Sequence, residues 1–303
     1  MRDIGPRGWA WRIALGAVVL FLVWAGTGLF TLQRAVSDAN DRVPDVARAA
    51  LDEPDGAMIR TPTNILIVGS DARPGETRSR ADTLMVMRLD PEDGKIKLLS
   101  IPRDFRVEIP GQGAQKINAS FFFAGQRGAI NAVKRLTGVP INHIMVIKFN
   151  GFDMLVDELG GVTVDNPTEL VNCPYSGGTT VSFAKGDIDL NGEEALQFAR
   201  VRRCDNDFQR ALRQQALVSA MKDQVLSLSS VPFAPWRGAA VIDTMNTDLG
   251  MLDMLQFGWL QARLDQNPED RILLTGTPMN IDGQSFVVGD ATANEQEIAE
   301  FMS

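Results

Sequence analysis

Arginine is concentrated in one short segment of this 303-residue chain. Positions 200–213 hold five arginines and two aspartates, a charge of +3 within a protein of net charge -8. A charge run is more often a solvated helix face. Lysine would make a helix face equally soluble, so the choice of arginine needs another reason. The planar guanidinium presents paired donors that match two phosphate oxygens at once. On helical spacing Arg210 and Gln214 lie one turn apart, and Arg200 and Arg202 point alike if extended. We therefore favour a polyphosphate site.

Two aspartates lie in loops next to predicted strands. Asp71 follows an apolar run in Gly69-Ser-Asp71-Ala-Arg73, and Asp82 opens the next strand in Arg80-Ala-Asp82-Thr. Loops beyond strand ends bind ligands in open α/β sheets. Mg²⁺ commonly binds through one or two carboxylates plus substrate phosphates. From spacing alone, a Mg²⁺ site is about as well supported as turns or ion pairs with the neighbouring arginines.

A third group of charges follows another predicted strand. The segment Ser100-Ile-Pro102-Arg103-Asp104 presents an arginine and an acid directly after a proline, and Lys116 adds a cation nearby. Singly these residues are typical of a protein surface. Together with the arginine-rich segment and the two aspartates, they become candidates for the same site.

Composition limits the chemistry. One histidine excludes a multi-histidine zinc site, and two cysteines exclude a four-cysteine metal site. The net charge of -8 argues against a nucleic-acid partner. Any catalysis must depend mainly on carboxylates and arginines, and a hard metal is compatible with them. Cys173 and Cys204 fit a disulfide and two separate buried thiols about equally well.

The N-terminal part predicts a membrane anchor. Ile13 to Gln33 carry no charge over twenty-one residues, against about 20 needed to cross a bilayer. Arg2, Arg7 and Arg12 precede this segment, so the positive-inside rule predicts a cytoplasmic tail at 1–12 and an extracytoplasmic remainder. We expect a transmembrane helix at 13–33, a stalk at 34–61 and one catalytic domain at 62–303. A cleaved signal peptide is the less favoured alternative.

The remaining pattern predicts a single three-layer α/β domain with a central mixed sheet flanked by helices. Apolar or alternating runs bounded by turn residues indicate strands near 64–69, 83–89, 95–101, 143–149, 162–164 and 285–288. Helical spacing indicates helices near 129–136, 191–198, 207–228 and 292–302. Residues 231–270 give the weakest pattern.

Six ordered segments resemble the LytR-CpsA-Psr family of cell-wall glycopolymer transferases. These segments are NILIVGSDAR, ADTLMVMRLDPEDGKIKLLSIPRD, KINASFF, GFDMLVDELGGVTVD, LNGEEALQFARVRR and DNDFQRALRQQ. The resemblance implies a membrane-anchored phosphotransferase that moves a glycopolymer from a polyprenyl-pyrophosphate carrier to peptidoglycan, with Mg²⁺ as cofactor. The family usually has tyrosine, serine and glycine where this chain has Phe198, Ala81 and Gln209.

The resemblance also implies a role for each charged residue. It makes Asp71 and Asp82 the metal ligands, and Arg103, Arg202 and Asp82 the catalytic set. The implied pyrophosphate-binding residues are Arg73, Arg103, Lys116, Arg200, Arg202, Arg210, Arg213 and Gln214. Asp82 and Asp104 are the two candidates for the general base.

Two alternatives to transfer stay open at this point. One is a hydrolase that cuts the polyprenyl pyrophosphate with water as acceptor. The other is a non-catalytic receptor that binds polyprenyl phosphates and regulates envelope synthesis. A cytoplasmic tail of twelve residues leaves little room for signalling, which counts against the receptor.

Overall fold

A computed structural model of the chain describes residues 6–70, 79–148, 151–175, 179–201, 204, 207–226, 234–265, 267 and 270–303. The helices are α1 (Pro6–Asp41), α2 (Asp45–Arg48), α3 (Asn118–Thr137), α4 (Phe152–Glu158), α5 (Gly192–Arg200), α6 (Asp207–Leu226), α7 (Ala234–Asp243), α8 (Met251–Arg263) and α9 (Ala291–Met302). The long strands are β1 (Thr63–Ser70), β2 (Ala81–Asp90), β3 (Lys95–Ile101) and β6 (His143–Lys148). The shorter strands are β4 (Arg106–Ile109), β5 (Gly113–Lys116), β7 (Val162–Asn166), β8 (Leu170–Pro174), β9 (Thr180–Phe183), β10 (Gly186–Leu190), β11 (Met245–Thr247), β12 (Arg271–Leu273), β13 (Gly276–Ile281) and β14 (Gln284–Gly289).

A six-stranded mixed sheet forms the centre of the larger lobe, in the order β11-β6-β1-β2-β3-β12. β1 pairs in parallel with β6 and antiparallel with β2, and β3 pairs antiparallel with β2. Successive side chains of a strand point to opposite faces. In β1, Leu66 and Val68 enter the core on one face, and Ile65 enters the core on the other. The uninterrupted apolar run of β1 therefore reflects a strand that is covered on both sides.

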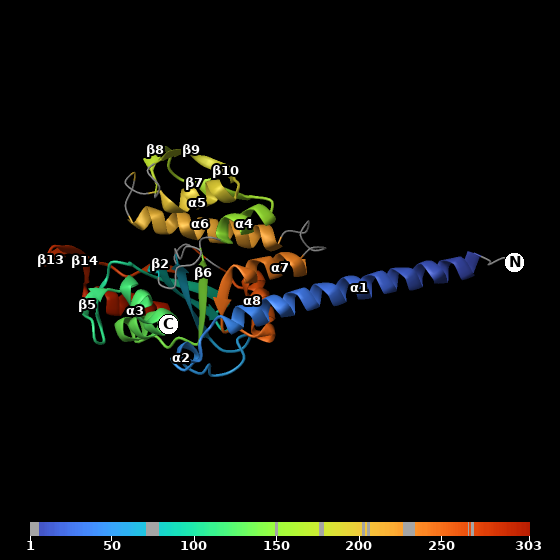
Figure 1. Ribbon diagram of the computed structural model, residues 1–303, viewed down its shortest axis with the longest axis horizontal. Helices are drawn as coiled ribbons and strands as arrows, with labels where there is room; N and C mark the ends of the chain where they lie inside the picture. The colour runs from blue at the N-terminus through green and yellow to red at the C-terminus, as the bar shows by residue number, and fades with distance from the viewer. Residues whose placement is uncertain are drawn as a thin grey trace.

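Helices cover both faces of this sheet, as Figure 1 shows. On one face α2, α3 and α9 bury Ala47, Ile130 and Phe301 with the strands. On the other face α8 buries Leu260 against strand residues that include Met87 and Met145. The three-layer α/β architecture expected from the sequence is confirmed.

A smaller lobe lies beyond one edge of the sheet, where α4, α5, α6 and the strands β7 to β10 share a separate core (Figure 1). Phe198 of α5 is fully buried there and meets the ring of Phe183 edge to face. A capping box at the start of α5, in which Asn191 and Glu194 exchange hydrogen bonds, fixes where this helix begins.

Cys173 and Cys204 form a disulfide, which settles the alternative that the sequence left open. Cys173 lies on β8, and Cys204 follows α5 by four residues, so the bond ties the β8–β9 hairpin to the arginine-rich segment. Tyr175 and Val201 form a backbone bridge beside it. The segment that carries Arg200 is therefore held at its far end by a covalent bond.

Reduction of this disulfide is expected to lower the free energy of unfolding by about 3 to 4 kcal/mol, because the bond closes a loop of 31 residues. The same loss is expected in a Cys173→Ala/Cys204→Ala chain. Chemical denaturation of the full chain in detergent, with and without reductant, measures it. The reductant should leave the double variant unchanged. Equal stability of reduced and oxidised wild type would contradict the prediction.

Residues 34–61 differ from the stalk that their composition suggested. α1 continues through this segment's first turns, and its Ala35 packs with Ile242 of α7. Further along, Ala47 and Met58 are buried in the two cores that flank the sheet. Alanine lets neighbouring elements approach closely, so the alanine-rich composition here belongs to a packed face.

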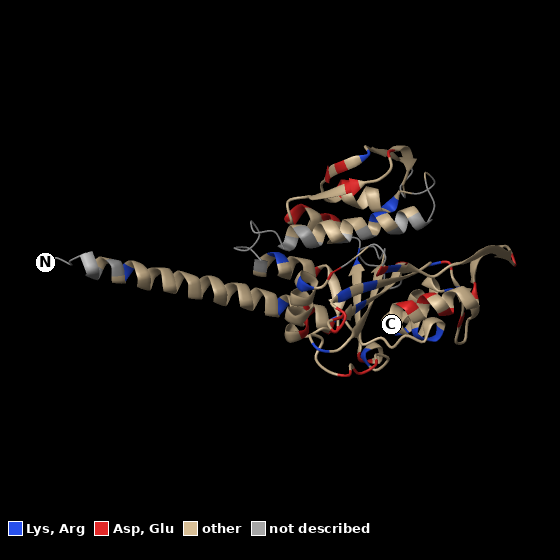
Figure 2. Cartoon of the chain, turned by 180° about the vertical axis from the view of Figure 1, so that it is seen from behind, with Lys and Arg blue, Asp and Glu red and all other residues tan. Residues whose placement is uncertain are grey.

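One described helix is long and apolar enough to cross a membrane, from Trp11 to Asp41. Its N-terminal part is exposed on all sides, and it carries no charge between Arg12 and Arg34 (Figure 2). This matches the expected apolar segment at 13–33.

Candidate functional site

The candidate site lies at the edge of the sheet that faces the smaller lobe. β1 and β3 end at this edge and β2 begins there, because Ser70 is in register with Ala81, and Leu84 with Ile101. A register shift between Gly69 and Ser70 loosens the β1–β2 ladder at this point. The strand ends next to the charged segments of the sequence therefore meet at one edge of the sheet.

Four charged side chains form a continuous network at this edge. Arg103 places Nη1 2.8 Å from Oδ1 of Asp82, and its Nε lies 3.8 Å from Oδ2 of Asp104. Lys116 places Nζ 2.9 Å from the other oxygen of Asp104. All four side chains keep about a quarter of their surface exposed. Opposite charges thus hold one another in place while remaining accessible to a ligand.

The backbone fixes the position of Arg103. Phe105 donates its N–H to the carbonyl of Pro102 at 3.0 Å, which turns the chain directly after β3. Asn118, at the start of α3, donates its N–H to the carbonyl of Arg103 at 3.1 Å. Phe105 is buried in the core below. A proline, a core aromatic and a helix start therefore determine where this guanidinium lies.

Arg103 retains binding capacity. Its Nη2 has no hydrogen-bond partner within the described part of the chain, and its buried Nε has none either. The guanidinium is thus held through Nη1 by Asp82 and can direct Nη2 towards a ligand. A phosphate oxygen is the acceptor that this geometry suits.

Gln214 connects the smaller lobe to the sheet edge. Its Oε1 accepts a hydrogen bond from the Thr83 hydroxyl at 3.3 Å, and its Nε2 donates to the carbonyl of Ala199 at 3.5 Å. Thr83 follows Asp82, and Ala199 precedes Arg200. One amide side chain therefore brings the arginine-bearing end of α5 next to the Asp82–Arg103 pair.

Arg213 differs from the expected phosphate contact. It is buried, donating from Nε to the carbonyl of Phe198 at 3.1 Å and from Nη2 to that of Val201 at 3.2 Å. Its guanidinium lies 5.7 Å from the Phe198 ring centroid. Desolvation by burial lowers the pKa of Arg213 to about 10, so it stays cationic at neutral pH. These two hydrogen bonds tie Arg213 to the backbone at the end of α5.

Several predicted site residues fall outside what the structure describes. Asp71, Arg73 and Arg202 lie outside the described residues, and for Arg210 only its place in α6 is described. Arg200 is half-buried at the end of α5 and is engaged in a contact. The residues that the structure brings together are thus Asp82, Arg103, Lys116 and Gln214, with Arg200 one residue from the Gln214 contact.

Asp82 is a candidate ligand for a magnesium ion. Asp82 offers a carboxylate at the edge, and its Oδ2 has no hydrogen-bond partner among the residues that can be described. No three or more acidic, histidine or cysteine residues of the described ranges gather to hold a metal. Mg²⁺ commonly binds through one or two carboxylates plus substrate phosphates, so Asp82 could serve as one of its protein ligands.

Lys148 is a cation at this edge that the sequence analysis missed. It ends β6, is exposed, and is in register with Ser70 of β1. A single lysine at a strand end gives no distinguishing pattern in a sequence. Only the parallel pairing of β1 with β6 shows that it belongs beside the loops of the site.

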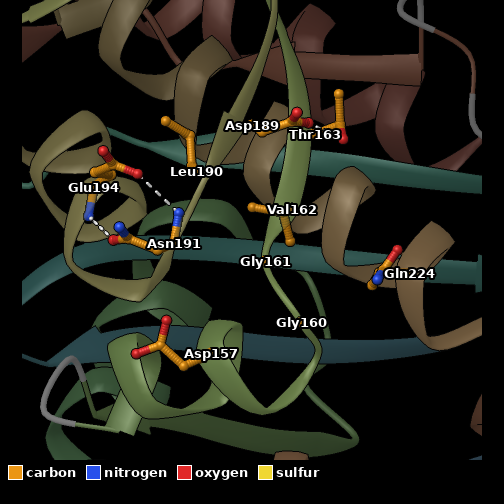
Figure 3. A pocket seen from close by; sticks show the side chains of 10 residues that line it. All are labelled: Asp157, Gly160, Gly161, Val162, Thr163, Asp189, Leu190, Asn191, Glu194 and Gln224. Carbon is orange, nitrogen blue, oxygen red and sulfur yellow. Dashed lines mark hydrogen bonds between the residues drawn. The ribbon is translucent and has the colours of Figure 1, made fainter.

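A cavity of about 500 Å³ lies elsewhere, in the smaller lobe, and Figure 3 shows its lining. Its acidic residues serve the local structure: Asp157 accepts the N–H of Gly192 at 2.7 Å, and Asp189 accepts the Thr163 hydroxyl at 2.6 Å. Glu194 belongs to the capping box of α5. Carboxylates have the wrong sign for a pyrophosphate, so this cavity is not the predicted anion site.

Fold and site together define an α/β protein with a cationic edge and an apolar N-terminal helix suited to a membrane. The model of the LytR-CpsA-Psr family matches residues 29–301. The chain belongs to this family, as its six ordered segments indicated.

Named relatives agree with this assignment. Over 192 residues the chain is 40% identical to the polyisoprenyl-teichoic acid–peptidoglycan teichoic acid transferase TagU of Halalkalibacterium halodurans. This match covers 62% of the chain and 61% of that relative, less than two thirds of its length.

Solved structures share the fold. The crystal structure of Bacillus subtilis TagV matches with a TM-score of 0.65 at 28% identity, over 80% of this chain and 96% of that one. The family protein YwtF (TagT) with bound octaprenyl pyrophosphate lipid matches with a TM-score of 0.63, over 82% of this chain and 92% of that one. At 22% identity the second comparison shows the fold alone.

Proposed function

We propose that this protein transfers a glycopolymer from a polyprenyl-pyrophosphate carrier to peptidoglycan. The observation that most directly supports this proposal is the position of the Arg103 guanidinium, which Asp82 holds at 2.8 Å. The arginine-bearing end of α5 lies next to the same edge of the sheet. Family membership and the transferase name of the TagU relative support the same chemistry. The N-terminal arginines and the apolar α1 support a single-pass protein whose main domain is extracytoplasmic.

The proposed reaction is a phosphoryl transfer from the carrier lipid to a wall sugar. A sugar hydroxyl of peptidoglycan attacks the glycan-side phosphorus, a new P–O bond forms, and the bond to the bridging oxygen breaks. The bridging oxygen leaves with the polyprenyl phosphate, so negative charge develops on it. Arg103, Lys116 and Arg200 stabilise that charge, and preorganised donors of this kind are usually the largest contribution to catalysis.

The proton of the attacking hydroxyl needs an acceptor. Asp104 lies in the same network and is tied to Lys116 at 2.9 Å, whereas Asp82 is the carboxylate suited to the cation. We assign Asp104 as the base when Asp82 holds Mg²⁺. Bound Mg²⁺ would neutralise phosphate charge as a Lewis acid.

The test uses the full chain in detergent with a synthetic polyprenyl-pyrophosphate-linked glycan and peptidoglycan oligomers. Expected products are glycan attached to the oligomers through a phosphodiester and an equal amount of polyprenyl monophosphate. Release of free glycan phosphate without attachment would instead identify a hydrolase. Tight binding without turnover would identify a receptor. Either outcome contradicts the proposal.

Removal of the metal is expected to stop transfer. Chelation followed by added Mg²⁺ should abolish and then restore the rate, and Asp82→Asn should lower it by about 10²-fold, as for loss of one preorganised electrostatic group. The variant should also need more Mg²⁺ for half-maximal rate. Glu92→Gln, an exposed acid in the β2–β3 turn, is the matched control. An unchanged Mg²⁺ requirement in Asp82→Asn would remove Asp82 from the metal site.

A further inference from the structure

Helix α8 is apolar on both of its faces. Its inner face packs Leu260 in the core and Met254 against neighbouring clusters. Its outer face exposes Leu252 by 72%, Leu255 by 52% and Trp259 by 59%. A helix of a soluble domain normally presents polar residues outward, and one that is hydrophobic all round is normally covered. The outer face of α8 therefore calls for a partner.

The exposed face continues along the whole helix. Gly258 and Ala262 are the other exposed positions between Leu252 and Ala262, so this outward stripe contains no polar side chain. At the end of the stripe Arg263 is exposed. Beside the middle of the helix, the exposed Ile59 donates its N–H to Gln256 of α8 at 3.3 Å, and the exposed Arg60 follows Ile59 in the chain. An apolar stripe bordered by arginines is the pattern of an interfacial membrane helix.

The position of α7 shows where the membrane would lie. The rings of Trp24 in α1 and Trp236 in α7 are 5.9 Å apart. A Cβ on Gly28 would lie only 2.9 Å from the Pro235 ring, so this glycine permits the close approach of α7. The apolar segment of α1 extends to Gln33. Hence the start of α7 lies beside Trp24 and Gly28, within the domain-proximal half of the membrane-crossing segment.

α8 lies further from the bilayer core than the start of α7 does. Its Met251 and Met254 pack on the cluster formed by Ala35 and Ala39 of α1, just after the apolar segment ends. Figure 1 shows α7 and α8 at the base of α1. Helices at this depth face the headgroup region, where tryptophan is enriched.

We propose that the outer face of α8, with Leu252, Leu255 and Trp259, docks on the lipid interface of the membrane that α1 enters. Arg60 and Arg263 would then meet anionic headgroups. Docking holds the catalytic lobes at a fixed height above the membrane and is independent of the transfer chemistry. The occupant is the bilayer because the patch adjoins the membrane-crossing helix.

The test measures the environment of an environment-sensitive fluorophore on the full chain in single-chain nanodiscs that contain anionic lipid. One label is attached at Leu255→Cys and a matched label at Val171→Cys, which is 59% exposed on β8 of the smaller lobe. Both positions are exposed, so both variants should fold, and the native cysteines are paired. The label at position 255 should shift to shorter wavelength and lose emission when brominated lipids are used. The label at position 171 should do neither.

Three results would overturn the proposal. The label at 255 could remain as water-exposed as the one at 171. It could shift to shorter wavelength without quenching by brominated lipid, which would indicate a protein partner. The emission shift of the label at 255 could disappear once discs that hold two protein chains are removed, which would indicate that a second copy of the protein covers α8. Transfer activity measured on the same preparations reports separately on the proposed function.

Discussion

Replacement of Arg103 by alanine is expected to lower the rate of glycopolymer transfer by about 10³-fold or more, as removal of one arginine does in other phosphoryl-transfer enzymes. The reason is geometric: Asp82 holds Nη1 at 2.8 Å, and the backbone is fixed by Asn118. The guanidinium therefore needs no reorganisation when charge develops on the bridging oxygen. Initial rates of glycan attachment measure the effect.

Arg103→Lys should recover little of this rate, because a lysine ammonium cannot bind Asp82 and a phosphate through separate arms of one planar fork. The matched control is Arg106→Ala, three residues away and exposed on β4. That variant removes the same charge from the same segment and should transfer at the wild-type rate. If Arg103→Ala and Arg106→Ala lowered the transfer rate equally, the loss would come from removing one positive charge and not from the position of Arg103.

Arg213→Ala is expected to lower the free energy of unfolding by about 2 to 4 kcal/mol, since it removes a buried side chain that donates hydrogen bonds to two backbone carbonyls. Those carbonyls belong to Phe198 and Val201, at the end of α5. The cation–π contact between the guanidinium and the Phe198 ring is lost as well. Denaturant titration of the full chain in detergent measures the difference.

Arg135→Ala removes an exposed arginine from α3 and should change stability by less than about 0.5 kcal/mol. Arg213→Ala should also slow transfer, because the end of α5 carries Arg200. If Arg213→Ala kept wild-type stability and lost only affinity for polyprenyl pyrophosphate, Arg213 would be a direct ligand contact. The pyrophosphate-binding role expected from the sequence would then be correct for Arg213.

The elements nearest the site were predictable because their patterns are local. The apolar run after Thr63 predicted β1, and the turn from Asp90 to Gly94 predicted the β2–β3 hairpin. In that turn Gly94 takes a positive φ of 73°, and Asp90 accepts the N–H groups of Glu92 and Asp93. The weak pattern at 231–270 had a physical cause as well: α7 packs on α1, α8 packs on the sheet and on α1, and α8 is apolar on its exposed face too, so no clear polar stripe marks either helix.

Residue types alone limit the chemistry that this chain can perform. A single histidine, two cysteines, an apolar N-terminal run and a cluster of arginines allow little beyond anion binding near a membrane, because side-chain type sets charge and donor geometry. The tertiary structure decided which residues act together. Strand pairing brought Asp82 and Arg103 to one edge, and burial turned Arg213 inward to backbone carbonyls. Such choices depend on contacts between distant segments, and a linear pattern does not encode which long-range contact is made.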